Sequence, residues 1–235
     1  MIYNERTSRH EQVVAAAHRM MTAARTAPKA RGVDIIEIAL IEGEELKVLA
    51  DKMVEIGNER NRPSFIRDAG NVLQAECVVV IGTKLQSLGL NCGHCGFATC
   101  AERENHHSQL SYSPSVLGGV PEGGGGSQFS ILSPKAQRPS VLNSQFQVPC
   151  SLNSIDVGIA VGSACATAAD LRLDTRVMYS IGVAVEQLGW MGSTSYSPPV
   201  LGGVPERGGG SDVKLVMGIA ISASSKNPFF DRPTK

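Results

Sequence analysis

Apolar residues recur at helical spacing in several stretches of the chain. In residues 8–26 they recur every three or four positions, with arginine and glutamate between them, which predicts an amphipathic helix. This helix is expected to end in the segment Thr26–Gly32, because Pro28 disfavours helical geometry in the residue before it. The same spacing predicts helices at residues 43–57 and 64–75.

Two further helices are predicted within residues 152–190, which brings the expected number to about five. The first is expected to bury Ile155, Ile159 and Ala166, which share one helical face. The second is expected to bury four aliphatic side chains: Val177, Ile181, Val185 and Leu188. The first helix also carries small residues that would let another backbone approach closely, at Gly158, Ala160, Gly162, Ala164 and Ala168. Such a contact would suit a homo-oligomer.

Three other apolar stretches have the character of strands. Val33–Ile41 is rich in β-branched residues, and Cys77–Ile81 is a continuous apolar run of the kind found in strands covered on both faces. Lys214–Ala223 has the same character. We therefore expect main strands at 33–41, 77–81 and 214–222 in a small mixed sheet. With the helices they predict a single α+β domain over residues 1–235, or in its more specific form a three-layer αβα arrangement.

Two segments, residues 108–148 and 193–211, do not fit this pattern. They are poor in charge and rich in serine, glycine and proline, which predicts flexible inserted loops. They also share a repeated cassette, SYSPSVLGGVPEGGGGS at 111–127 and SYSPPVLGGVPERGGGS at 195–211. Two copies far apart in the sequence do not make a solenoid.

The chemistry is concentrated in Cys92, Cys95 and Cys100, a CxxCxxxxC run within residues 86–150. Thiolates this close in sequence can turn toward one inorganic centre, and glycine directly follows two of them. Gly93 and Gly96 lack Cβ, so the backbone can curl tightly and bring its N–H groups near the sulfurs.

A closed site needs a fourth ligand, and Cys150, directly after Pro149, is the candidate. The long gap after Cys100 does not exclude Cys150 as a ligand. Compared with a gap of about 12 residues, loop closure costs roughly 1.3 kcal/mol more. Metal–thiolate binding contributes on the order of 10 kcal/mol. Cys77 and Cys165 are the rival ligands, and both fit better as buried small apolar residues.

Zinc stays open as the metal. His94, His106 and His107 lie close to the cysteine run in sequence and could serve as ligands. Only one CxxC pair is present, however, whereas zinc sites usually have two such pairs or one with paired histidines. A Cys₄ iron–sulfur cluster is therefore the leading hypothesis, and the histidines are expected to be solvated loop residues.

Composition narrows the expected partners and location. Lys+Arg and Asp+Glu number 22 each, and aromatic residues are few, so neither nucleic acid nor an anionic membrane is expected as a partner. There is no run of about 18 apolar residues, and the polar N-terminus is unlike a secretory signal. We expect a cytoplasmic protein, in which grouped cysteines bind metal more often than they form disulfides.

Five stretches together resemble a prokaryotic family of uncharacterised proteins that contain a ferredoxin domain. They are TAPKARGVD, LGLNCGHCGFATCAE, DVGIAVGSA after the fourth cysteine, DTRVMYSIGVAVEQLG and VMGIAISASSKNPFFDR. The resemblance implies a 4Fe–4S cluster on Cys92, Cys95, Cys100 and Cys150. It also implies that the two cassettes are extra relative to the family. A weaker similarity, to nitroreductase-like flavoproteins, adds FMN as a second cofactor to consider.

Three functions follow as hypotheses. The first is a 4Fe–4S redox protein that transfers electrons to or from a partner protein or a small-molecule donor or acceptor. The second is a flavin-dependent reductase in which the cluster is an electron relay. The third is a zinc-stabilised binding module. No catalytic residue is predicted, and whether the protein is an enzyme stays open.

Overall fold

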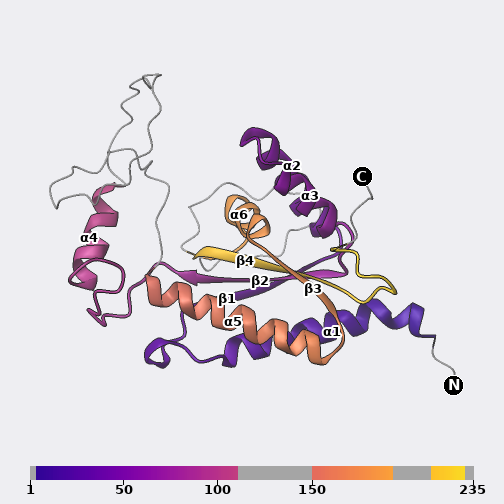
Figure 1. Ribbon diagram of the computed structural model, residues 1–235, viewed down its shortest axis with the longest axis horizontal. Helices are drawn as coiled ribbons and strands as arrows, with labels where there is room; N and C mark the ends of the chain where they lie inside the picture. The colour runs from indigo at the N-terminus through magenta and orange to yellow at the C-terminus, as the bar shows by residue number, and fades with distance from the viewer. Residues whose placement is uncertain (1–3, 111–149, 193–212, 231–235) are drawn as a thin grey trace, which may run out of the picture.

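The computed structural model describes residues 4–110, 150–192 and 213–230, and for residues 106–110 the backbone only. A four-stranded sheet lies between two layers of helices, with one further helix at the end of the sheet (Figure 1). The predicted α+β class is confirmed, in its three-layer form. Both repeated cassettes lie outside the described residues, as do the predicted loops that contain them, except for residues 108–110, which form the end of a helix, α4 (Cys100–Leu110), and not part of a loop.

The sheet has the order β1-β2-β4-β3. Its strands are β1 (Ile36–Glu42), β2 (Cys77–Lys84), β3 (Asp174–Met178) and β4 (Val213–Ser222). All three pairings among these strands are antiparallel, so the prediction of a mixed sheet is wrong. The register explains the first pairing: the chain leaves β1 at Glu42 and returns at Cys77, its direct partner. The helices that connect the two strands return the chain to the end of the sheet at which β1 finishes, so β2 runs in the opposite direction.

The helices predicted at 8–26, 43–57 and 64–75 are present, as α1 (Glu5–Thr26), α2 (Glu45–Glu59) and α3 (Pro63–Val72). Helices α1 and α5 (Ser151–Asp170) cover one face of the sheet, and α2, α3 and α6 (Tyr179–Leu188) cover the other (Figure 1). Strand β2 is buried along almost its whole length and contributes side chains to the hydrophobic cores on both faces of the sheet. Val78 and Val80 pack toward α2, α3 and α6, and Val79 and Ile81 toward α1 and α5.

Helix α6 is seated directly on β4. A Cβ built on Gly182 would lie 1.5 Å from the carbonyl oxygen of Val216, so only glycine fits at this contact. The Glu186 carboxylate accepts the Val216 N–H at 3.2 Å, where the pairing of β2 with β4 is irregular. These contacts fix the helix against the strand.

The buried face of α5 differs from the prediction. Ile155 and Ile159 are 47% and 39% exposed, and Ala166 is also exposed. The buried apolar residues are small ones and one valine: Val157, Ala160, Ala164 and Ala168. Their small side chains let α1 pack closely, and the Ser163 hydroxyl donates to the Ala23 carbonyl at 2.9 Å. The close helix contact expected from these small residues is therefore made within the chain.

The second helix of this region begins later than predicted. Val177 belongs to β3, which was not predicted, and is 39% exposed. Ile181 and Val185 are fully buried, and Leu188 is partly buried. Helix α5 is the one helix in the described ranges with the length and hydropathy to cross a membrane by composition alone. In the structure it packs against α1 and the sheet.

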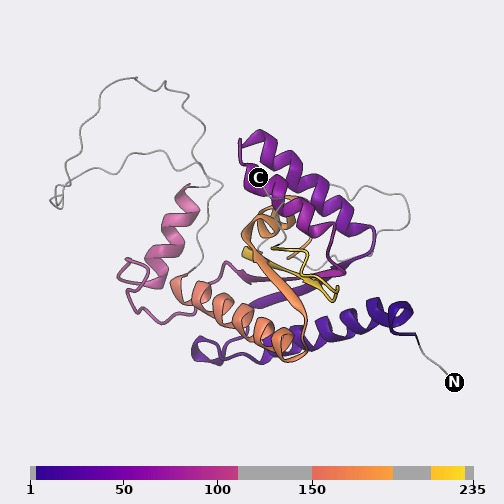
Figure 2. The ribbon, with the colours of Figure 1, turned by 45° about the vertical axis from the view of Figure 1, so that its right-hand side comes forward.

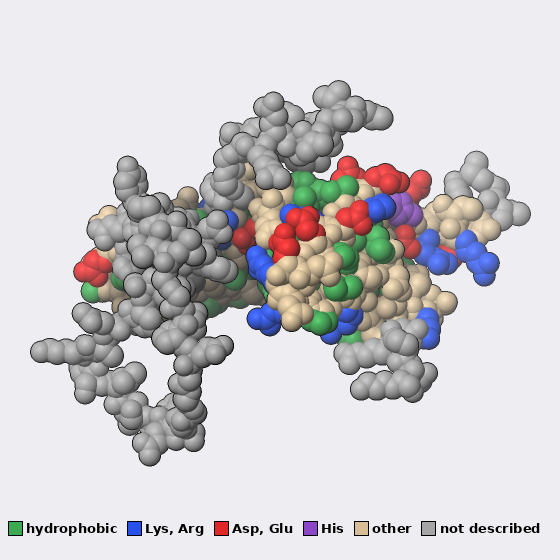
Figure 3. All heavy atoms as spheres, turned by 90° about the horizontal axis from the view of Figure 1, so that it is seen from above, with side chains coloured by type: hydrophobic (Ala, Val, Ile, Leu, Met, Phe, Trp, Pro, Cys, Tyr) green, Lys and Arg blue, Asp and Glu red, His purple; other side chains and the backbone are tan. Residues whose placement is uncertain are grey.

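Acidic, basic and histidine side chains lie intermixed on the face seen in Figure 3, and no large area of one sign dominates it. This fits the equal numbers of acidic and basic residues in the sequence.

Candidate metal centre

The predicted cysteine run lies at one end of the sheet. The chain leaves β2 at Lys84, passes through a loop that holds Cys92 and Cys95, and enters helix α4 (Cys100–Leu110). Helix α4 and this loop lie beside the beginning of α5, which follows Cys150 directly (Figure 2).

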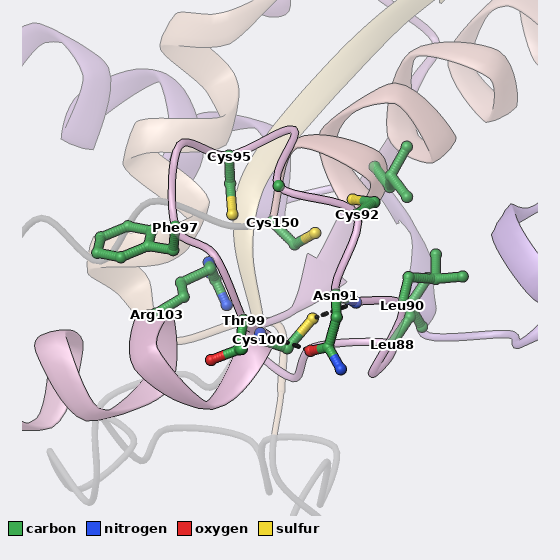
Figure 4. Close-up of a pocket in the computed structure, with 12 residues that line it drawn as sticks. Leu88, Leu90, Asn91, Cys92, Cys95, Phe97, Thr99, Cys100, Arg103 and Cys150 are labelled. Atoms are coloured by element: carbon green, nitrogen blue, oxygen red, sulfur yellow. Dashed lines mark hydrogen bonds between the residues drawn. The ribbon is translucent and has the colours of Figure 1, made fainter.

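All four predicted ligands line one pocket. Cys92, Cys95, Cys100 and Cys150 contribute to its wall, and Figure 4 shows their sulfur atoms turned toward its middle. The long sequence gap therefore does not keep Cys150 from the other three. The other lining residues that the structure describes carry no negative charge: Leu88, Leu90, Asn91, Gly93, Phe97, Thr99, Arg103 and Leu152.

Exposure differs among the four cysteines. Cys92 is exposed, Cys95 and Cys100 are half-buried, and Cys150 is buried at 6% exposure. One side of the site thus faces solvent at Cys92, and the opposite side is embedded against the body of the protein.

The two predicted glycines shape the loop as expected. Gly93 and Gly96 have φ values of +68° and +87°, in the left-handed region that favours glycine. The Gly96 N–H donates to the Gly93 carbonyl at 2.9 Å, which closes a tight turn around Cys95.

Asn91 joins the two ends of the cysteine run, a role that the sequence analysis missed. Its side-chain oxygen accepts the Cys100 N–H at 2.9 Å, and its own N–H donates to the Cys100 sulfur at 3.3 Å. Asn91 adopts φ +49°, which asparagine tolerates better than most residues. The N–H···S contact is of the kind that tunes an iron–sulfur centre.

Helix α4, also missed, begins with a capping box. The Thr99 hydroxyl accepts the Glu102 N–H at 3.1 Å, and the Glu102 carboxylate accepts the N–H groups of Ala98 and Thr99 at 3.0 and 3.3 Å. The four residues TCAE are the sequence signal for this start. Because α4 begins at Cys100, the helix places that sulfur at its N-terminal end.

Cys150 is the N-cap residue of α5, and no side chain caps this helix. Two helices therefore begin at predicted ligands. The N-terminus of a helix carries partial positive charge and favours a negatively charged group nearby. Both helix ends would stabilise a thiolate-bound centre.

The segment ahead of the cysteines is tied to three elements. The buried Asn153 donates to the Gln86 carbonyl at 2.8 Å, the Glu104 carboxylate accepts the Ser87 N–H at 3.2 Å, and Arg31 donates to the Leu88 carbonyl at 2.6 Å. Hydrogen bonds from Ser87 hold the pKa of Glu104 below its ordinary value. These bonds fix the loop to α5, α4 and the turn at Ala30–Gly32.

Helix α5 holds the turn at Ala30–Gly32 in place. The Ala30 N–H lies 3.1 Å from both carboxylate oxygens of Asp156, which is 3% exposed. The motif TAPKARG therefore supports the site without contributing a metal ligand.

The two remaining cysteines lie outside the pocket. Cys77 is fully buried in β2, and burial, reinforced by the charges of Glu42 and Glu76, raises the pKa of its thiol to about 12. Burial also raises the pKa of Cys165, against a hydrogen bond with Thr175 that lowers it. All six cysteines lie in the described ranges, and none forms a disulfide.

The spacing of the cysteines bears on the identity of the metal. In the described part of the chain, no three His, Cys, Asp or Glu side chains lie close enough together to hold one metal ion. Around a single zinc ion at 2.3 Å, tetrahedral sulfurs would be about 3.8 Å apart. In a 4Fe–4S cluster each thiolate binds a different iron, so the sulfurs surround a wider centre. The donor set, four thiols with no carboxylate or imidazole among the lining residues that the structure describes, fits such a cluster.

Among the three predicted histidines, the structure describes the side chain of His94 alone. His94 is exposed and does not line the pocket. His106 and His107 lie on α4, and their side chains are outside the described part.

The structure thus defines an α+β protein with a four-cysteine pocket. A family described as "Uncharacterized protein containing a ferredoxin domain (DUF2148)" matches residues 147–205, which include Cys150. An Archaeoglobus fulgidus protein described as "Uncharacterized protein" is 35% identical over 237 residues, with all of both chains covered. The chain belongs to this ferredoxin-domain family.

Solved structures resemble the chain more distantly. Bacillus megaterium NfrA2 gives a TM-score of 0.44 at 15% identity, over 94% of this chain and 61% of that protein. The hypothetical oxidoreductase YcnD from Bacillus subtilis gives 0.41 at 13% identity, over 91% and 58%. A BluB-like flavoprotein from Clostridium difficile 630 gives 0.42 at 15% identity, over 94% and 84%. The chain thus spans about three fifths of the length of the first two.

Proposed function

We propose that the protein binds one 4Fe–4S cluster through Cys92, Cys95, Cys100 and Cys150 and transfers single electrons. The observation that carries this proposal is the meeting of Cys150 with the CxxCxxxxC run in one pocket, whose described lining residues include no carboxylate or imidazole. Membership of a ferredoxin-domain family supports it.

The cluster, when bound, supplies a site that gains and loses one electron. The residues of the chain hold that site and control its surroundings. The Asn91 N–H directed at the Cys100 sulfur offsets negative charge on the thiolate. Leu88, Leu90 and Phe97 form an apolar part of the wall that limits the access of water.

Electron exchange is proposed to occur at the exposed side of the pocket, around Cys92. This is the one cysteine of the four that is exposed, so a partner can approach most closely there. The partner is a redox protein or a small-molecule electron donor or acceptor, and the proposed location is the cytoplasm, where thiols stay reduced.

The proposal is tested by analysis of protein purified without oxygen. We expect four iron and four sulfide per chain, a broad absorbance near 400 nm, and bleaching by dithionite. Protein that is colourless and carries one zinc per chain would contradict the proposal and support the zinc-stabilised alternative. Denaturing the same sample tests for FMN: released flavin fluorescence in proportion to the chain would support a flavin-dependent reductase with the cluster as relay.

A further inference from the structure

The four cysteines of the pocket differ in how far water can reach them. Solvent contacts Cys92 freely, reaches Cys95 and Cys100 in part, and is almost excluded from Cys150, which is 6% exposed. Their sulfur atoms nevertheless point toward one centre (Figure 4). Of the four proposed metal–sulfur bonds, the bond at Cys92 therefore lies nearest the solvent.

Exposure matters because the release of a metal ion from a thiolate needs water twice. The departing ion must be hydrated, and the freed thiolate takes up a proton or reacts with a reagent from solution. At Cys92 both partners are available at the surface. At Cys150 they would have to reach a side chain that is almost wholly buried.

The backbone also holds the cysteines to different degrees. Cys100 is the first residue of α4, and the Asn91 side chain accepts its N–H at 2.9 Å. Cys150 is the N-cap residue of α5, a helix of 20 residues. Cys92 lies in the loop directly before Gly93, whose φ is +68°. Because glycine leaves the backbone freer to turn, Cys92 can move away from the centre with less disturbance of the fold than the two cysteines at helix starts.

Cys95 is the closest rival, because it lies in the same loop as Cys92. It is half-buried, however, and it lies within the turn that the Gly96 N–H closes on the Gly93 carbonyl at 2.9 Å. Exposure and the turn therefore both favour Cys92 over Cys95 as the ligand that lets go first.

We propose that Cys92 is the ligand that releases its iron first when the cluster is oxidised, which leaves a centre held by Cys95, Cys100 and Cys150. The inference rests on the proposed function and adds the order in which the ligands are released. The bond between the Cys92 sulfur and its iron breaks, and the sulfur keeps the bonding electrons and takes up a proton. One Fe²⁺ leaves, the three remaining irons together give one electron to an added acceptor such as ferricyanide, and the four sulfides stay bound.

The test is stepwise oxidation of the cluster-loaded wild-type protein with ferricyanide, without oxygen and with a chelator that takes up free Fe²⁺. After each step, iodoacetamide labels the free thiols, and fragment mass spectrometry of the peptide that contains Cys92, Cys95 and Cys100 locates the label. We expect iron to fall from four to three per chain while sulfide stays at four. In that form, Cys92 should carry the label about fivefold more often, or more, than any other proposed ligand. Cys165, which does not line the pocket, is the internal control, and its labelling should not change on oxidation.

A pair of variants gives a second measurement. Cys92→Ala and Cys95→Ala each remove one thiol from the same loop, three residues apart. We expect Cys92→Ala to retain about three iron and four sulfide per chain, and Cys95→Ala to retain less of both.

The contrary results are equally specific. Label spread evenly over the four proposed ligands, or concentrated on one other than Cys92, would overturn the inference. Loss of iron and sulfide together, without a form that has three irons, would also overturn it, as would at least as much iron in Cys95→Ala as in Cys92→Ala. Wild-type protein purified without iron and sulfide would refute the proposed function itself, and the inference with it.

Discussion

Gly182 gives the sharpest prediction of stability, because its contact with β4 leaves no room for a side chain. In Gly182→Ala the new Cβ would lie 1.5 Å from the carbonyl oxygen and 2.4 Å from the carbonyl carbon of Val216. Ordinary contact begins near 3.4 Å, so α6 and β4 would have to separate by about 2 Å. Both are backbone elements of one core, and neither can give way as a flexible side chain would.

The expected cost lies at the upper end of the usual penalty for overpacking, about 3 kcal/mol of the free energy of unfolding. A domain of this kind has a total of about 5–15 kcal/mol, so the loss is large. The same substitution at Gly162 is the matched control. That glycine is in the interior of α5, with no atom within 4 Å of the built Cβ. Gly162→Ala should therefore stabilise the helix, by up to about 1 kcal/mol.

The assay is urea unfolding followed by circular dichroism, with all variants at the same state of cluster loading, since bound ligand adds to apparent stability. Unfolding at a lower midpoint in Gly182→Ala and an equal or higher midpoint in Gly162→Ala would agree with the packing described. A loss below 1 kcal/mol in Gly182→Ala, or the same loss in both variants, would refute the seating of α6 on β4.

Three further predictions concern the site. In cluster-free reduced protein at pH 8, iodoacetamide should alkylate the exposed Cys92 at least tenfold faster than Cys77, because the Cys77 thiol is buried and has a pKa of about 12. Mass spectrometry of the peptides measures the two rates, and equal rates would contradict the burial of Cys77. Asn91→Ala removes the acceptor for the first N–H of α4 and strains a φ of +49°, so the cluster should be lost to a chelator several-fold faster, whereas Asn91→Gly should lose it more slowly than the alanine variant does. The lowered pKa of Glu104 means that its ionised form stabilises the fold above its ordinary pKa of 4.5 and ceases to do so as the pH falls through the folded value. The difference in stability between wild type and Glu104→Gln should therefore shrink below pH 4.5, and a difference that grows on acidification would contradict this.

The elements that the sequence predicted share long and regular patterns. Helix α1 has apolar positions at helical spacing, strand β2 begins with a continuous apolar run, and the structure buries these residues. The grouping of Cys150 with the CxxCxxxxC run was also predicted, because thiols with a common metal must meet whatever the length of chain between them.

The elements that were missed lack such patterns. Helix α4 is strongly polar, and its signal is the capping box at Thr99 and Glu102 rather than an apolar stripe. Strand β3 has only five residues and leads directly into α6, so its pattern merged with that of the helix. On α5 the bulkier isoleucines were expected inside, but the close approach of α1 requires small residues at the contact.

The residues that support the site could not be predicted from local pattern. Asn91 acts through hydrogen bonds to Cys100, nine residues away, and Asn153 through one to Gln86, 67 residues away. Arg103 would be expected in water on the basis of its charge, and only the three-dimensional structure places it in the pocket wall. The sequence thus identified the thiols, and the structure was needed for the groups that surround them.

Cys150 is proposed to complete the metal centre. The most direct measurement is iron and sulfide per chain in Cys150→Ala beside Cys165→Ala, both purified without oxygen. Each variant removes one thiol, but only Cys150 lines the pocket. We expect Cys165→Ala to keep four iron and four sulfide and Cys150→Ala to lose most of both or to retain a degraded cluster. Full iron and sulfide in Cys150→Ala, with the wild-type spectrum and potential, would contradict the proposed role of Cys150.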